Sequence, residues 1–427
     1  MSTQVTRRQF IHLGALAGGA IAAPGLLSAC GGSQGGGAES DVFKVGAVLE
    51  LSGSSATGGQ VAKRGYELWA KTVNAKGGIK VGGQSYKVEL QVQDCQSQPS
   101  VGAQVAERLA SQEGVDAMFG SYTSGVQIAM NPICAKYKVP CIAGSAESPG
   151  NWTPQPEFTY GIIPAVDLTA AKSIQSIVDS AGSPPQTAAV LGVNEPFSDD
   201  TAKGFRLGVQ ESGLTEVHYS LFPANADLAP IASVVAGKTP DVVAVGGHDV
   251  LLVDFVKALK AAEYTPKAII EHYGITDASF AKALGQDAEG VLGISVWLPN
   301  APHEDDLFGK ASDYGQAFEE AHGSAPDYTA AGCSAAGEVL QLALQELGEA
   351  PSLSEESRVQ LNSILAKTDV ETFFGPIQFA DSGDHFHNNT ALAPILVQVQ
   401  DGQIVAIDPP DASQSEMIYP LEPWSSR

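Results

Sequence analysis

Short apolar runs alternate with longer amphipathic segments from about residue 42 onward, and this alternation limits the chain to few folds. The short runs are typical of buried strands, and the longer segments repeat apolar residues at intervals of three and four, as helices do. The first predicted strands are residues 44–49, 86–92, 115–119 and 139–143, and the helices between them are residues 60–75, 101–112 and 125–138.

A second set of the same kind follows. Its predicted strands are residues 187–193, 240–245 and 267–270, and its helices are residues 198–211 and 250–262. Repeated strand, helix and strand units form parallel sheets that are covered by helices on both faces. Because a chain of 427 residues is long enough for two domains, we expect an α/β protein with two lobes. Ligands of such folds bind beyond the carboxyl ends of the strands.

The N-terminal residues carry an export signal. Arg7 and Arg8 precede Phe10 and Ile11, which resembles the twin-arginine export motif. The run that follows is too short and too weakly apolar to span a membrane. Leu-Ser-Ala before Cys30 resembles a bacterial lipobox. We expect residues 1–29 to be a removed signal peptide and Cys30 to be lipidated. The alternative is a chance cysteine in an ordinary signal peptide.

Residues 30–41 comprise the lipidated cysteine and a glycine-rich tether. About ten flexible residues span roughly 17 Å, which is enough to lift a domain off a bilayer while keeping it there. The predicted location is therefore exported, either lipid-anchored to the outer face of the cytoplasmic membrane or in the periplasm.

The net charge of the chain is −24, and removal of the signal peptide takes away two arginines and no acid. Such a surface repels nucleic acid and anionic lipid headgroups. We therefore expect no nucleic-acid partner, and membrane attachment through the lipid alone.

Four cysteines follow Cys30: Cys95, Cys134, Cys141 and Cys333. An even number in an exported chain permits disulfides, and Cys134 with Cys141 is the first pair to test. Four separate buried thiols remain the alternative.

Donors for a metal occur near the C-terminus, where His385 and His387 lie close to Asp381 and Asp384. The segment has the character of a turn after a strand, so we predict no metal site and no cofactor. Catalytic groups cannot be placed together on strand ends either, and no catalytic residue is predicted.

Several short motifs resemble the leucine/isoleucine/valine-binding proteins, which are type I periplasmic solute-binding proteins of ABC importers. The most specific is Asn-Ala-Lys-Gly-Gly-Ile at residues 74–79, where paired glycines allow the positive φ that a helix-to-strand turn requires. The other matches are residues 51–53, 94–99, 120–124, 288–291 and 374–379. The resemblance covers about residues 42–407.

This resemblance implies two three-layer α/β lobes joined by three crossing strands, near residues 160–164, 292–296 and 373–377. The first lobe would comprise residues 42–163 plus 293–372, and the second residues 164–292 plus 373–427. Closure of the lobes on a small molecule would be the functional motion.

The resemblance also implies a ligand site on two first-lobe loops. Their candidate residues are Tyr122, Thr123, Ser124, Ser145, Ala146 and Glu147. In amino-acid-binding members, hydroxyls and backbone N–H groups of these loops hold the ligand carboxylate, and Ser124 falls on the family's serine. Ser124 could also be a plain N-cap of the helix that starts near residue 125, and the two roles are compatible. Phe197 would supply the aromatic residue of the second lobe.

Two departures from the family leave the ligand open. Tyr273 stands where amino-acid binders place an acid, with Glu271 two residues earlier, and Glu147 replaces a threonine. Because a buried carboxylate needs a partner, Glu147 either points into solvent or meets a cationic or amide group of the ligand. Trp297 could wall the pocket or pack in the core.

The predicted function is that of a substrate-binding lipoprotein of an ABC importer, a monomer without enzymatic activity. It would bind a small polar solute, a branched-chain or related amino acid above all, and deliver it to permease subunits in the membrane. The alternatives are a receptor for amides, urea or aromatic acids on the same fold, and an exported two-domain α/β enzyme.

Overall fold

The computed structural model describes residues 42–427, with the exception of the side chains at positions 249 and 278. The predicted signal peptide, the lipidated Cys30 and the tether lie outside these residues. Within them, none of the helices is long and apolar enough to cross a membrane.

Strands and helices alternate over most of this length. The strands are β1 (Val42–Leu49), β2 (Ile79–Val81), β3 (Gln84–Asp94), β4 (Ala117–Phe119), β5 (Cys141–Ala143), β6 (Thr159–Gly161), β7 (Thr187–Val193), β8 (Thr215–Phe222), β9 (Val242–Gly246), β10 (Ala268–His272), β11 (Leu292–Ser295), β12 (Glu304–Asp305), β13 (Gly309–Lys310), β14 (Asp369–Thr372), β15 (Gly375–Gln378), β16 (Ile395–Gln400) and β17 (Gln403–Asp408). The α-helices are α1 (Ala56–Ala75), α2 (Pro99–Arg108), α3 (Ser124–Tyr137), α4 (Val166–Ser180), α5 (Pro196–Glu211), α6 (Leu228–Lys238), α7 (Asp249–Ala261), α8 (Ala278–Leu284), α9 (Ala311–His322), α10 (Tyr328–Leu347) and α11 (Glu355–Leu365).

The first lobe contains a six-stranded sheet in the order β2-β3-β1-β4-β5-β6. All neighbouring strands in it are parallel except β2 and β3, which form a hairpin. Helix α2 continues as a π-helical turn, η1 (Leu109–Glu113), which ends at Gly114 with a φ of +65°. The helix predicted over residues 101–112 is therefore confirmed, with a wider last turn.

The second lobe contains a seven-stranded sheet in the order β17-β16-β11-β10-β9-β7-β8. Its predicted strands 187–193, 240–245 and 267–270 are parallel neighbours in the structure. Two further strands, β16 and β17, add to the sheet in antiparallel fashion. Strand β11 also belongs to this sheet, which therefore extends three residues past the lobe boundary predicted at residue 292.

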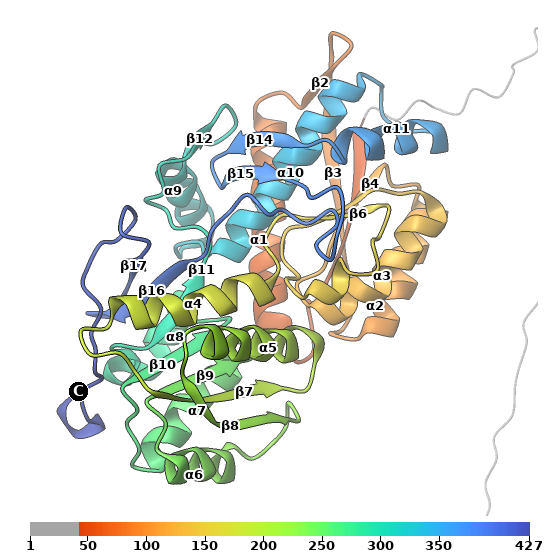
Figure 1. Cartoon of the computed structure of the whole chain (residues 1–427). Coiled ribbons are helices and arrows are strands. Elements are labelled where there is room, and N and C mark those ends of the chain that lie inside the picture. The colour runs from red at the N-terminus through yellow and green to blue at the C-terminus, as the bar shows by residue number, and fades with distance from the viewer. Residues whose placement is uncertain (1–41) are drawn as a thin grey trace, which may run out of the picture. The chain divides into compact units, whose positions relative to one another are not determined.

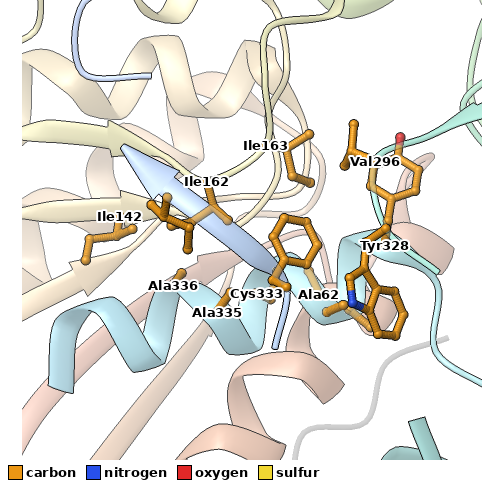
Figure 2. Packing of buried hydrophobic residues seen from close by; sticks show 14 of the residues in the cluster. Ala62, Ile142, Ile162, Ile163, Val296, Tyr328, Cys333, Ala335 and Ala336 are labelled. Carbon is orange, nitrogen blue, oxygen red and sulfur yellow. The ribbon is translucent and has the colours of Figure 1, made fainter. Parts of the chain in front are cut away.

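After β11 the chain returns to the first lobe, where α10 packs against α1 (Figure 1). The packed face of α10 is made of small residues, so the two helices approach closely. A Cβ atom on Gly65 of α1 would lie 2.2 Å from the carbonyl oxygen of Ala330. Figure 2 shows Cys333, Ala335 and Ala336 of α10 in one buried cluster with Ile142 and Ile162. This packing fixes the N-terminus of α10 at the edge of the first sheet, next to the loops that follow its strands.

Candidate functional site

Loops from both lobes meet at the carboxyl ends of the parallel strands. The first lobe contributes the loops after β4 and β5 together with the start of α10. The second lobe contributes the ends of β9 and β10 and the start of α5. This is the edge where ligands bind in α/β folds.

Glu147, from the loop after β5, makes the central contact between the lobes. Its Oε2 lies 3.1 Å from Nε2 of His272 at the end of β10. Its Oε1 accepts a hydrogen bond of 2.9 Å from the hydroxyl of Tyr328 at the start of α10. The Glu147 side chain is only 7% exposed. The structure does not place this carboxylate in solvent, and both of the partners given above are side chains of the protein.

Tyr122 makes a second contact across the cleft. Its hydroxyl lies 3.0 Å from Nδ1 of His248, which follows β9. The His248 ring stacks on Phe197 with 4.8 Å between ring centroids. Burial lowers the pKa of His248 below its ordinary value, with nearby Glu195 opposing the shift. The imidazole is therefore neutral at pH 7.

Six aromatic rings lie between the two lobes and form a closed cycle, in which each ring contacts the next. They belong to Phe197, His248, Tyr122, Tyr273, Tyr328 and His272. Successive centroid separations are 4.8 Å for Phe197–His248, 5.3 Å for His248–Tyr122, 5.8 Å for Tyr122–Tyr273, 5.4 Å for Tyr273–Tyr328, 6.2 Å for Tyr328–His272 and 5.5 Å for His272–Phe197. Two of the rings come from the first lobe and four from the second. Separation of the lobes would therefore open the cycle.

Asp327 adds a second carboxylate beside this cycle. It caps α10 by accepting a 2.8 Å hydrogen bond from the N–H of Ala330, and the Tyr273 hydroxyl donates to its other oxygen. Burial, with a further contribution from the charge of Asp277, raises the pKa of Asp327 to about 6. Asp327 is therefore mostly ionised at pH 7 and loses its charge in mildly acidic solution.

Glu50, at the end of β1, occupies the backbone donors of the loop after β4. It accepts hydrogen bonds of 3.0 Å from the N–H groups of Tyr122 and Thr123, and a third from the Thr123 hydroxyl. Burial raises the pKa of Glu50 despite these bonds. The amides that we expected to receive a ligand carboxylate are thus already bonded to a carboxyl group of the protein.

Several other polar groups of the two loops are bonded to each other. Ser124 is the first residue of α3, with Thr123 at the N-cap, so the predicted cap lies one residue later than the real one. The Ser124 hydroxyl accepts a 3.0 Å bond from the N–H of Ser148. Ser145 donates to the carbonyls of Ser121 and Tyr122, and Ala146 has a φ of +69°.

A cleft of about 480 Å³ adjoins the cycle of rings and is lined from both lobes. Thr123 and Ser55 belong to its first-lobe wall, and His248, Glu195 and Val250 to its second-lobe wall. The volume falls within the range typical of small-molecule sites.

Two predicted site residues lie apart from this cluster. Ile269 and Ile270 face different core clusters, and because side chains alternate along a strand, Glu271 shares the face of Ile269 and His272 that of Ile270. Glu271 therefore points to the far side of the second sheet. Trp297 packs against the rings of Tyr314, Phe373 and Phe374. Its ring N–H donates a hydrogen bond to the carbonyl of Phe373.

Four members of the cluster were not predicted: His248, His272, Asp327 and Tyr328. The two histidines end or follow strands of the second sheet, so the rule that ligands bind beyond strand ends could have indicated them. Asp327 and Tyr328 start a helix that returns from the second lobe, and only tertiary contact brings them to the cleft.

Neither a metal cluster nor a disulfide occurs within residues 42–427. His385 lies 3.2 Å from Asp167, and His387 contacts the carbonyl of Pro156. All four cysteines there are buried free thiols, and a hydrogen bond with Cys141 together with burial raises the pKa of Cys134. The alternative of buried thiols therefore describes this structure.

Comparison with known proteins agrees with this architecture. The sequence profile of a family described as periplasmic binding protein matches residues 42–403. Leu/Ile/Val-binding protein homolog 8 from Brucella abortus is 27% identical over 392 residues, which cover 88% of this chain and 93% of that protein.

Two solved structures share the fold at low sequence identity. A solute-binding protein from R. palustris in complex with benzoate has a TM-score of 0.74 at 21% identity, covering 86% of this chain and 95% of that one. The LivJ substrate-binding protein of Streptococcus pneumoniae in complex with isoleucine has a TM-score of 0.72 at 22% identity, covering 86% and 100%. With two α/β lobes, loops from both lobes that meet at the strand ends and a profile match over most of its length, this chain belongs to the periplasmic binding protein family, in the type I group that includes the leucine/isoleucine/valine-binding proteins.

Proposed function

We propose that the protein is the substrate-binding component of an ABC importer, which captures a small polar solute between its lobes and delivers it to permease subunits. The observation that carries this proposal is the pair of contacts across the cleft, Glu147 with His272 and Tyr122 with His248. Each joins one lobe to the other at the strand ends. A ligand bound there would contact both lobes and so favour their closed arrangement.

Branched-chain or related amino acids are the first solutes to test, because the relatives of this chain include Leu/Ile/Val-binding protein homologues and LivJ was solved with isoleucine. A receptor for amides, urea or aromatic acids is the second candidate. The six rings of the cleft favour it, and a structural neighbour was solved with benzoate.

Thermal unfolding of the purified protein with amino acids, amides and aromatic acids tests this function. A ligand at one hundred times its dissociation constant adds about 2.7 kcal/mol to the free energy of unfolding. Absence of any shift across the panel would remove the main support for solute binding. Recovery of the bound solute unchanged, followed by mass spectrometry, tests the proposal that the protein performs no chemistry.

Export and anchoring are part of the proposal. A monomer attached through lipid on Cys30 would meet its permease at a raised effective concentration. Incorporation of radiolabelled palmitate in cells is expected for the native protein and not for Cys30→Ser. Equal labelling of both proteins would refute anchoring at Cys30.

We also propose a division into two lobes. The first comprises residues 42–163 plus 293–372, and the second comprises residues 164–292 plus 373–427. The chain leaves the six-stranded sheet after β6, leaves the seven-stranded sheet after β11 and joins it again at β16, and these connections support a division into two lobes.

A further inference from the structure

Several hydrogen-bond donors beside the ring cycle already have acceptors within the protein. The N–H groups of Tyr122 and Thr123 are bonded to Glu50, and the N–H of Ser148 is bonded to Ser124. The Tyr328 hydroxyl donates to Glu147. A ligand carboxylate at this position would have to displace these internal acceptors.

Negative charge dominates the same region. Glu147 and Asp327 lie buried beside the rings, and Glu195 and Asp254 line the adjoining cleft. Among the described residues that line this cleft, there is neither lysine nor arginine. A second carboxylate from a ligand would add repulsion at a site with little solvent screening.

The cycle of six rings suits the opposite charge. The faces of tyrosine and phenylalanine rings attract cations within about 6 Å of the ring centroid, and this attraction grows when the site is desolvated. Tyr122, Phe197, Tyr273 and Tyr328 are all at most 5% exposed. Lobe separation would move the rings of Tyr122 and Tyr328 from the other four and create a space with aromatic faces on two sides.

Unused polar atoms in the same place also point to a ligand. Nδ1 of His272 and Nε2 of His248 are buried without a hydrogen-bond partner among residues 42–427, although Nε2 of His248 lies 3.6 Å from Glu195. His272 is 1% exposed, and its ring belongs to the cycle. A ligand hydrogen-bonding group between the lobes would satisfy such atoms.

From these observations we propose that the solute is a small organic cation without a carboxylate, whose ammonium group lies between the six rings and the carboxylates of Glu147 and Asp327. This inference rests on the proposed solute-binding function and gives its ligand a chemical class. It departs from the zwitterionic amino acids, whose carboxylate would meet Glu147 and the bonded amides of the loops.

Matched probes that differ only in the carboxylate test the inference. Isothermal titration and thermal unfolding of the purified protein would compare leucine with 3-methylbutylamine and phenylalanine with phenethylamine, together with tetramethylammonium and benzoate. We expect at least one amine or ammonium probe to bind and to do so at least tenfold tighter than its amino-acid counterpart or benzoate.

The outcomes separate this inference from the proposed function. Tighter binding of leucine, phenylalanine or benzoate than of the amines would leave solute binding intact and overturn the cation assignment. Binding of none of the probes would count against both.

Two isosteric variants test whether the ammonium group of the probe lies beside Glu147. Glu147→Gln is expected to weaken binding of the amine probe at least tenfold, because it removes the charge beside the ring cycle. Glu338→Gln is the matched control: Glu338 is also buried on the first-lobe side, but lies ten residues along α10 from Tyr328, about 15 Å away along the helix. Equal effects of the two variants, or none from Glu147→Gln, would overturn the placement of the ammonium group.

Discussion

The carboxylate of Glu147 lies between Nε2 of His272 and the hydroxyl of Tyr328, at 3.1 Å and 2.9 Å. One residue of the loop after β5 thus joins the last residue of β10 to the first residue of α10. A buried carboxylate is costly unless it is hydrogen-bonded, so each partner of Glu147 contributes to stability.

Tyr328→Phe should lower the free energy of unfolding by about 1.5–3 kcal/mol, the usual value of a hydrogen bond to a charged group. Burial and the nearby Glu147 raise the pKa of Tyr328 well above its ordinary value, so the hydroxyl is a permanent donor. Tyr314→Phe is the control. Its hydroxyl pairs with the neutral Ser334, and we expect a smaller loss of about 1 kcal/mol. Urea unfolding would compare the two, and equal losses would contradict a charged partner for Tyr328.

Gly58 of α1 leaves room for the ring of Tyr122. A Cβ atom at this position would lie 2.1 Å from Cζ of Tyr122, so Gly58→Ala must displace the ring. We expect a loss of about 1–3 kcal/mol in the free energy of unfolding, as overpacking usually causes, and weaker binding of the solute in titration.

The control for Gly58→Ala is Gly237→Ala in α6, where a Cβ atom would have no heavy atom within 4 Å. Alanine there is expected to leave binding unchanged and to raise helix stability by about 0.5–1 kcal/mol. Unchanged binding in Gly58→Ala as well would show that the Tyr122 ring does not contribute to the site.

The alternation of apolar and amphipathic segments was sufficient to predict the central strands of both sheets. Residues 187–193 form β7 with the expected bounds, because buried parallel strands carry unbroken apolar runs. The antiparallel strands β16 and β17 at one side of the second sheet were missed. Their sequence, such as Gln398 and Gln400 within β16, mixes polar and apolar residues in a way that also suits a loop.

The part of the site that could be predicted was the part carried by the family resemblance. The resemblance indicated Tyr122, Glu147, Phe197 and Tyr273, and the structure places them in the ring cycle or bonded to it. The sequence could not show that Glu50 accepts hydrogen bonds from the N–H groups of Tyr122 and Thr123. These residues lie 72 and 73 positions from Glu50 in the chain. The sequence motif led us to expect a ligand carboxylate at these amides. Because Glu50 already accepts their hydrogen bonds, we propose a cationic ligand instead.

The affinity for an amine probe should depend on pH through Asp327. Its pKa of about 6 means that it is protonated at pH 5 and ionised at pH 7, and only the ionised form attracts a cation. Titration with phenethylamine should show about tenfold weaker binding at pH 5 than at pH 7, since each pH unit below the pKa changes the ionised fraction about tenfold.

Protonation of His248 would act in the same direction, because it adds positive charge to the cleft. The variant Asp327→Asn distinguishes the contribution of Asp327 to the pH dependence from that of His248. Asparagine keeps the helix cap and cannot titrate, so any pH dependence that remains comes from groups other than Asp327, such as His248. Affinity that is independent of pH in the native protein would contradict a cationic ligand beside Asp327.

Glu271 provides a test that does not involve the ligand. Both of its carboxyl oxygens are buried without a hydrogen-bond partner among residues 42–427, and burial raises its pKa well above the ordinary value of 4.5. Above pH 4.5 the unfolded chain releases this proton while the folded protein keeps it. Stability should therefore fall as the pH rises, by up to about 1.4 kcal/mol per pH unit until the folded pKa is reached.

Glu271→Gln removes this titration with little change of shape. Relative to the native protein, the variant should gain stability as the pH rises above 5 until the pKa of the folded Glu271 is reached, and contributions from other groups cancel in the difference. Urea unfolding of both proteins at several pH values measures this gain. A difference that stays constant with pH would mean that Glu271 is ionised in the folded protein and has a partner. Solute binding should be the same in both proteins, because Glu271 faces the far side of the second sheet from His272.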